Sequence, residues 1–335
     1  ASPATSAAGN QRVSVIVLEP ANCLECFSFV NLTTELFPGD FEQVSFADQK
    51  GKDLVAKYSI SKLPALIILN ESKVTNEQLK LLLVRNQDAM VLEAPIPLFF
   101  EVATGKVKGK VTSFSISPAN CVQCVKASDF IGEVKANQVT IENRNLAADS
   151  QEAKDLIAKY NVKFLPAFIL SSDLLEYPSF KQAWSTLGSV ESDGFLVMRQ
   201  PFPPYVNISN NKVEGLVSAI YLTDNSCPTC YNVSIHKAAM KNYNVFIVNE
   251  TYVGVASLQG KALVVQYNVT KVPTVILSKE ANVYGALMPV WQSIGSVESD
   301  GVLVFREFDT VPGLIYKNLL TNSTITVNAT NVLAS

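Results

Sequence analysis

Hydrophobic and polar positions follow the same order three times along the chain. Each block opens with a run of β-branched and aromatic residues, which is typical of a strand. It continues with an amphipathic segment, such as Leu54, Val55 and Tyr58, whose spacing is that of one helix face. An uninterrupted apolar run then predicts a strand that is buried on both faces. The opening runs are 13–18, 111–116 and 216–222, further strands are expected at 138–142 and 244–249, and the apolar runs are 65–69, 167–170 and 274–277.

These blocks are internal repeats, as an alignment of the chain with itself demonstrates. The segment 52–64 (KDLVAKYSISKLP) aligns without a gap to 154–166 (KDLIAKYNVKFLP) and to 261–273 (KALVVQYNVTKVP). The second and third repeats also share the stretches 184–194 and 291–301, each of which begins with a Trp that we expect to anchor packing. At roughly 100–150 residues per domain, a chain of 335 residues holds two or three domains. The predicted boundaries are 1–107 for the first and most diverged repeat, 108–212 for the second, 213–320 for the third and 321–335 for a β-prone tail.

The β-prone tail permits two interpretations. It is rich in Thr, Val and Ile, and it follows the third repeat at the place where segments 108–111 and 212–217 lead from one repeat into the next. The tail either folds back as an edge strand or pairs with the first repeat of another copy, which would give a head-to-tail chain.

Two cysteines separated by two residues precede the Pro that ends the aligned segment in every repeat. A helix is expected to begin at each pair, where unpaired N–H groups and the helix dipole favour the thiolate of the first Cys. The pairs are Cys23/Cys26, Cys121/Cys124 and Cys227/Cys230, and the prolines are Pro64, Pro166 and Pro273, which follow the first Cys by 41, 45 and 46 residues.

Three kinds of chemistry fit such a Cys pair. It is a centre for thiol–disulfide exchange, an inert disulfide, or half of a zinc site. A disulfide across so short a loop adds little stability through chain entropy, which favours a redox origin. Zinc needs four ligands, whereas each repeat offers two thiols and the chain has a single His, His236, which we expect to lie on a helix face.

A strand, a Cys-x-x-Cys pair, a helix and a later Pro, repeated three times, resemble tandem thioredoxin-fold proteins of the thioredoxin and protein disulfide isomerase class over residues 11–318. The resemblance implies an α/β fold with three tandem thioredoxin-like domains, each a central mixed β-sheet flanked by helices. The long repeats are also similar to secreted prokaryotic thioredoxin-like proteins.

The resemblance assigns roles to the site residues. Cys23, Cys121 and Cys227 would attack, and Cys26, Cys124 and Cys230 would resolve the mixed disulfide, with no organic cofactor or metal. Pro64, Pro166 and Pro273 would be cis, would face the Cys pairs and would offer a backbone edge to an extended substrate peptide.

The repeats depart from the family pattern next to the cysteines. The aromatic residue that usually precedes the first Cys and the buried acid six positions before it are both replaced, and Glu19 and Asp224 are the nearest substitutes for that acid. Pro228 and Thr229 between the third pair are similar to glutaredoxin-type sites, whereas Glu25 between the first pair disfavours a thiolate. The third repeat is therefore predicted to be the most active, then the second, then the first.

Composition excludes several classes of protein. The net charge is −3, so the basic excess typical of a nucleic-acid binder is missing. Hydrophobic residues make up 48% of the chain, which excludes wholesale disorder, and no apolar run approaches the roughly 20 residues of a membrane span. Charged residues are only 17%, against roughly 25% in an average soluble domain, as expected for a surface covered by sugar or by a partner.

Asn-x-Ser/Thr sequons are more frequent than chance pairing of 25 Asn with 48 Ser and Thr would give. Together with an even number of cysteines, this excess indicates an exported glycoprotein, secreted or at the cell surface. The small residues 1–9 fit a mature N-terminus left by signal cleavage or the edge of a longer chain. Asn268 also aligns with Asn161, which has no sequon and is expected to end a helix. The sequons are at Asn31, Asn70, Asn207, Asn232, Asn249, Asn268, Asn322 and Asn328.

Three hypotheses of function follow. The first is an exported protein that exchanges thiols and disulfides with cysteines or disulfides of other exported proteins. The second is a glycosylated, disulfide-stapled structural subunit of a surface assembly or filament, which binds copies of itself and has no enzymatic activity. The third is a peptide-binding or chaperone-like module. Solvent exposure of Cys227 separates the first two, because exchange needs an accessible sulfur.

Overall fold

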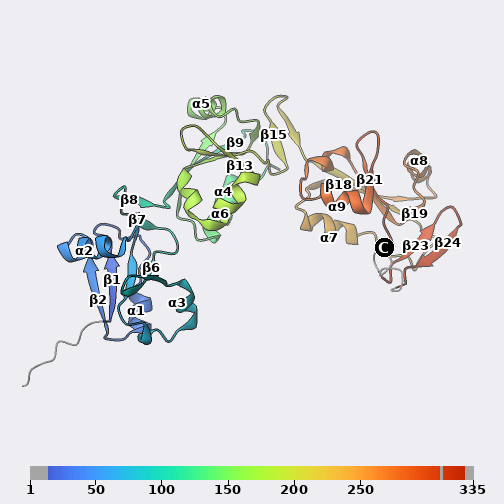
Figure 1. Ribbon diagram of the computed structural model, residues 1–335. Coiled ribbons are helices and arrows are strands. Elements are labelled where there is room, and N and C mark those ends of the chain that lie inside the picture. Colours follow the sequence, from blue (N-terminus) through green and yellow to red (C-terminus); the bar gives the residue numbers. More distant parts are fainter. Residues whose placement is uncertain (1–13, 310–311, 329–335) are drawn as a thin grey trace, which may run out of the picture. The chain divides into compact units, whose positions relative to one another are not determined.

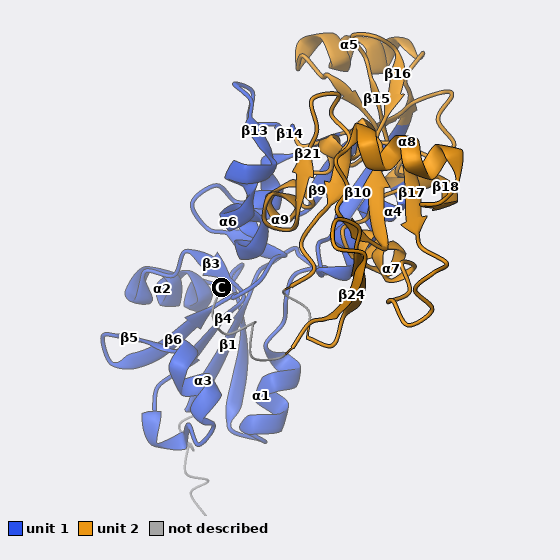
Figure 2. Ribbon diagram, turned by 90° about the vertical axis from the view of Figure 1, so that its right-hand side faces the viewer, with its two compact units in different colours: residues 1–115, 128–145, 168–199 blue, residues 116–127, 146–167, 200–335 orange. Residues whose placement is uncertain are grey.

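The computed structural model describes residues 14–309 and 312–328 (Figure 1). The predicted N-terminal segment 1–9, the first residue of the first predicted strand and the end of the tail after Asn328 lie outside the described residues. The described chain falls into two compact units (Figure 2). One contains everything described up to Ser115 together with 128–145 and 168–199, and the other contains 116–127, 146–167 and the described residues from Gln200 onward.

Each repeat forms a five-stranded mixed sheet whose second strand precedes the Cys pair. In the first repeat, β1 is parallel to β2 and antiparallel to β4, and in the third repeat β17 is parallel to β18 and antiparallel to β20. The first sheet has the order β2 (Phe41–Ser45), β1 (Val15–Glu19), β4 (Ala65–Ile68), β6 (Ala89–Glu93), β5 (Val84–Asn86). The second has the order β10 (Ile141–Ala147), β9 (Val111–Ser117), β12 (Ala167–Leu170), β14 (Leu196–Met198), β13 (Gly188–Val190). The third has the order β18 (Ile247–Gly254), β17 (Val217–Thr223), β20 (Thr274–Leu277), β22 (Leu303–Phe305), β21 (Gly295–Val297).

Both faces of the first sheet are apolar because side chains alternate along each strand. Val15 and Val17 belong to a core with Phe29 and Phe37, whereas Ile16 and Leu18 belong to a core with Tyr58 on the other face. The third sheet is also buried on two faces, one of which is closed by the fully buried Trp291. Trp184 is buried as well, so both Trp residues anchor packing as predicted.

Helices cover the sheets (Figure 1), and two kinds of local signal set their ends. Ser150 and Ser257 cap two helix N-termini by accepting backbone N–H bonds from Ala153 and Gly260. Asn161 and Asn268 follow helices with φ of 49° and 46°, which confirms that they end helices. The α-helices are α1 (Val30–Leu36), α2 (Gln49–Tyr58), α3 (Glu77–Leu82), α4 (Ala127–Ala136), α5 (Gln151–Lys159), α6 (Pro178–Leu187), α7 (Ile235–Asn242), α8 (Leu258–Gln266) and α9 (Met288–Ile294), and the 3-10 helices are η1 (Glu71–Lys73), η2 (Ser172–Glu176) and η3 (Lys279–Val283).

A β-hairpin follows each five-stranded sheet and pairs with the short strand before the repeat's aligned Pro. The three small sheets are β3 (Lys62–Leu63), β7 (Phe99–Glu101), β8 (Lys106–Lys108); β11 (Phe164–Leu165), β15 (Tyr205–Asn207), β16 (Lys212–Glu214); and β19 (Lys271–Val272), β23 (Ile315–Asn318), β24 (Ser323–Thr326). The predicted tail therefore folds back as an edge strand over 323–326. We call β23–β24 the third hairpin.

Tyrosines fix the two linkers that join the repeats. Gly109 has a φ of +90°, and its carbonyl accepts a hydrogen bond from the Tyr177 hydroxyl. Gly215 has a φ of +91°, and its carbonyl accepts the equivalent bond from Tyr284. A side chain at these positions would be strained, so the backbone requires Gly there.

Candidate functional site

All three Cys pairs are closed as disulfides. The S–S distances are 2.01 Å for Cys23–Cys26, 2.03 Å for Cys121–Cys124 and 2.09 Å for Cys227–Cys230. Each pair lies in the loop between the second strand of its sheet and the following helix.

The expectation that a helix begins at each Cys pair is wrong. α1 begins at Val30, α4 at Ala127 and α7 at Ile235, each at least three residues after the second Cys of its pair. The helix dipole acts mainly within the first turn, so each first Cys lies beyond the part of the helix where the dipole acts most strongly. The physical cause lies in the loops, because polar and turn-forming residues around each pair favour bends over a helix.

At least one cysteine of every pair is partly exposed, and the position of the exposed cysteine within the pair differs between the repeats. Both cysteines of the first pair are half-buried. In the second pair Cys121 is half-buried and Cys124 is buried. In the third pair the order is reversed, because Cys227 is only 6% exposed and Cys230 is half-buried. The first Cys is therefore more accessible in the first two repeats than in the third, which is the repeat predicted to be the most active.

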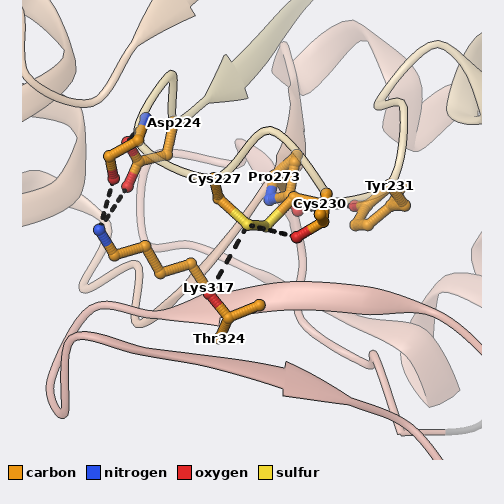
Figure 3. The surroundings of a disulfide bond; sticks show 9 residues. Asp224, Cys227, Cys230, Tyr231, Pro273, Lys317 and Thr324 are labelled. Atoms are coloured by element: carbon orange, nitrogen blue, oxygen red, sulfur yellow. Dashed lines mark hydrogen bonds and ion pairs between the residues drawn. A yellow bond between two sulfur atoms is a disulfide. The ribbon is translucent and has the colours of Figure 1, made fainter.

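The aligned prolines are cis, as the resemblance implies, and Pro273 lies beside the third disulfide (Figure 3). The expectation that each proline offers an open backbone edge is wrong. β3, β11 and β19, which directly precede the prolines, already pair with β7, β15 and β23. The hairpins are too far along the sequence for local patterns to reveal this pairing.

Asp224 contacts the third hairpin instead of a sulfur. Its carboxylate accepts the Ser226 backbone N–H at 2.8 Å and forms an ion pair with Lys317 at 3.2 Å (Figure 3). Burial alone would raise the pKa of the Asp224 carboxyl, but the bonds from Ser226 and Lys317 lower it. A carboxylate held ionised by a lysine is a poor proton acceptor for Cys230, so the predicted role of Asp224 is not supported.

The pKa of Glu19 is shifted in the direction opposite to that of Asp224. Burial raises the pKa of its carboxyl, while a hydrogen bond from the Ser28 hydroxyl lowers it by a smaller amount. A carboxyl with a raised pKa takes up a proton more readily.

A buried network next to the third pair was not predicted. The Tyr231 hydroxyl donates to the Pro273 carbonyl at 2.6 Å and lies 2.8 Å from His236 Nε2. Since Tyr231 has one proton to give, Nε2 of the neutral imidazole is the donor in the second bond. Burial lowers the pKa of His236 to about 4, so the ring is neutral at pH 7. His236 thus supports the proline loop through Tyr231.

Seven of the eight sequon asparagines are exposed, and Asn207 is half-buried. The Asn207 side-chain N–H donates to Glu214 at 2.9 Å. This hydrogen bond uses Nδ2, the atom to which a glycan would be attached. The last residue of the Asn328 sequon lies outside the described residues.

Over residues 14–309 and 312–328, no group of three or more His, Cys, Asp and Glu side chains is placed to hold a metal ion. Over the same residues, no helix has the length and apolar character needed to cross a membrane.

A mixed sheet of this order, a Cys-x-x-Cys disulfide after its second strand and a cis-Pro before its central strand define a thioredoxin-like domain, and the chain has three of them in tandem. No family model and no curated protein matches the chain.

Similar solved structures were found at low identity. Human ERp44 is similar over 51% of this chain and 44% of its own, with 7% identity and a TM-score of 0.17. The alkylhydroperoxide reductase subunit AhpF of Enterococcus faecalis is similar over 51% of this chain and 82% of its own, with 17% identity and a TM-score of 0.18. Full-length ERdj5 is similar over 85% of this chain and 46% of its own, with 8% identity and a TM-score of 0.18. In the first and third of these matches, the chain thus covers less than half of the other chain's length.

Proposed function

We propose that the protein carries out thiol–disulfide exchange with cysteine-containing polypeptides, and that Cys121–Cys124, whose first Cys is half-buried, is a more accessible centre than Cys227–Cys230, whose first Cys is buried. The observation that carries the proposal is the partial exposure of at least one cysteine in every disulfide, on a loop at the edge of a thioredoxin-like domain. Access decides which sulfur an incoming thiolate attacks.

Exchange at Cys121–Cys124 takes place in two steps. A substrate thiolate attacks the sulfur of the half-buried Cys121, a mixed disulfide forms, and the electron pair of the broken S–S bond stays on Cys124. A second substrate thiolate then attacks the substrate sulfur of the mixed disulfide and releases Cys121 as a thiolate. Two electrons pass to the protein, the substrate becomes a disulfide, and two protons end on Cys121 and Cys124.

The polypeptides are proposed to be exported, and the protein is proposed to be secreted or to lie at the cell surface. Three closed local disulfides support an oxidising compartment. The seven exposed sequon asparagines support a surface that accepts glycans.

The structural role is the second candidate. It is favoured by the buried Cys227 of the third repeat, and by the backbone edges before the three cis prolines, which are all already paired. In that case the protein would be a glycosylated subunit that associates with copies of itself, with its disulfides as staples.

Reduction potentials separate the two candidates. The native protein is equilibrated in glutathione or dithiothreitol buffers, alkylated and analysed by mass for each pair. Working exchange centres titrate between roughly −120 and −270 mV, and we expect Cys121–Cys124 to do so. Replacing Cys121 and Cys124 by Ser should remove that transition alone. Pairs that all remain oxidised below about −300 mV would reject exchange and favour the staple.

A further inference from the structure

The third hairpin occupies the backbone edge beside the Cys227–Cys230 disulfide. In the register of β19 with β23, Lys271 lies opposite Asn318 and Val272 opposite Lys317. Two further backbone bonds extend this contact. The Leu319 N–H donates to the Thr270 carbonyl at 2.8 Å, and the Tyr231 N–H, directly after Cys230, donates to the Ile315 carbonyl at 2.8 Å. A strand edge pairs with one partner at a time, so no other extended chain pairs here while β23 is in place.

Side chains of the same hairpin cover the sulfur. Thr324 Oγ1 lies 3.8 Å from Cys227 Sγ (Figure 3). Lys317 donates to the Ser226 hydroxyl at 2.6 Å and pairs with Asp224, where the two side chains are only 15% and 9% exposed. An ion pair with so little water around it is screened less than a surface pair, and the removal of one partner leaves the other charge uncompensated.

The hairpin positions that make these polar contacts in the third repeat are apolar in the other two. The positions that match Lys317 in strand register are Phe100 and Val206, which pair with the residue before the cis-Pro in their own repeats. Within each hairpin, Phe100 pairs with Val107 and Val206 pairs with Val213, whereas Lys317 pairs with Thr324. In the third repeat, the hairpin therefore carries a charge toward the Cys loop at a position that is apolar in the first two repeats.

We propose that the third hairpin is a displaceable segment in a polypeptide-binding site, and that an extended cysteine-containing polypeptide takes its place on β19 before Cys227 exchanges. This inference rests on the proposed function. When the hairpin leaves, the polypeptide thiolate bonds to Cys227 Sγ, the Cys227–Cys230 bond breaks, and its electron pair stays on the Cys230 sulfur, which takes a proton from water. The ion pair of Lys317 with Asp224 holds the hairpin closed.

The test measures how fast each disulfide opens in the full-length protein. The reagents are a short single-cysteine peptide and a phosphine, which reduces disulfides without thiol exchange, and the products are alkylated and quantified by mass for each pair. Lys317→Met removes the ion pair and keeps the length of the side chain. Lys237→Met is the matched control, because it breaks an exposed pair with Glu250 in the same repeat. Asp224→Asn is a second variant, in case Lys317→Met fails to fold.

Lys317→Met should raise the rate at Cys227–Cys230 about tenfold with both reagents, which corresponds to about 1.4 kcal/mol in the opening equilibrium. Cys121–Cys124 should react at its native rate, and Lys237→Met should change neither pair. Hydrogen exchange should show faster exchange of the third-hairpin amides while the five-stranded sheet stays protected.

Two results would overturn these claims in distinguishable ways. If the hairpin amides exchange faster but the Cys227–Cys230 rate is unchanged while Cys121–Cys124 reacts with the peptide, the hairpin is no barrier and only this inference fails. If the phosphine rate rises but no pair reacts with the peptide thiol, the proposed function fails, and replacement of the hairpin by a substrate fails with it.

Discussion

Acidification should destabilise the third repeat through its buried His236, the single histidine of the chain. Burial lowers the pKa of the imidazole from 6.5 to about 4, so between these values the unfolded chain binds a proton that the folded chain does not. The free energy of unfolding therefore falls as the pH drops through this window and is fully retained above it. From these two pKa values, the loss between pH 7 and pH 5 is about 2 kcal/mol.

The matched variant is His236→Gln, which keeps a side-chain donor near Tyr231 and does not titrate. Hydrogen exchange of third-repeat peptides at pH 7 and pH 5, corrected for intrinsic rates, should show the loss in the native protein and a smaller one in the variant. Subtracting the loss in the variant from the loss in the native protein removes the contribution of the carboxyl groups, which both proteins share. Since there is one histidine, its imidazole C–H resonance also gives the pKa directly. A pKa near 6.5, or equal pH dependence in both proteins, would refute the reasoning.

Two matched pairs of substitutions test the packing. Gly51→Ala should cost about 3 kcal/mol, because the added Cβ would lie 2.1 Å from a carbonyl oxygen at the end of β2. Gly132→Ala, where an added Cβ meets nothing within 4 Å on α4, should stabilise by about 0.5–1 kcal/mol. Tyr284→Phe should cost about 2 kcal/mol, because its buried hydroxyl accepts the Phe246 N–H, whereas Tyr221→Phe should be neutral or stabilising, because the Tyr221 hydroxyl is buried with no hydrogen-bond partner among the described residues. Thermal unfolding followed by circular dichroism measures all four, and equal effects within either pair would contradict the assignments.

The fold could be predicted because its determinants are local and repeated. The spacing of Leu54, Val55 and Tyr58 predicts α2, and the apolar run after Pro64 predicts β4, because each pattern depends on neighbouring residues. The order of the strands and helices could also be predicted, because the same succession of patterns occurs three times and is therefore a stronger signal than a single occurrence. The helix starts were missed because a Cys pair does not determine whether the following turn is helical.

The surroundings of the site could not be predicted from the sequence, because they depend on contacts between distant segments. Thr324 contacts the third disulfide, and Lys317 contacts the loop that carries it, from a hairpin that lies 91 to 97 residues further along the chain. One signal was available in the sequence. In an alignment of the three hairpins, Lys317 falls at a position that is apolar in the other two repeats, Phe100 and Val206, and such an exception calls for a structural reason.

The first two hairpins also connect the repeats. β8 ends at Lys108 and β9 begins at Val111, and β16 ends at Glu214 while β17 begins at Val217. A pulling force along the polypeptide therefore acts on β8, which pairs with β7, and on β16, which pairs with β15. It acts on these strands before it acts on the five-stranded sheet that follows each hairpin. Mechanical tension and access to the edge beside Pro64 and Pro166 are thus coupled by the covalent path. In a single-molecule pulling experiment, we expect reduction of Cys23–Cys26 and Cys121–Cys124 to accelerate at forces too small to unfold the five-stranded sheets.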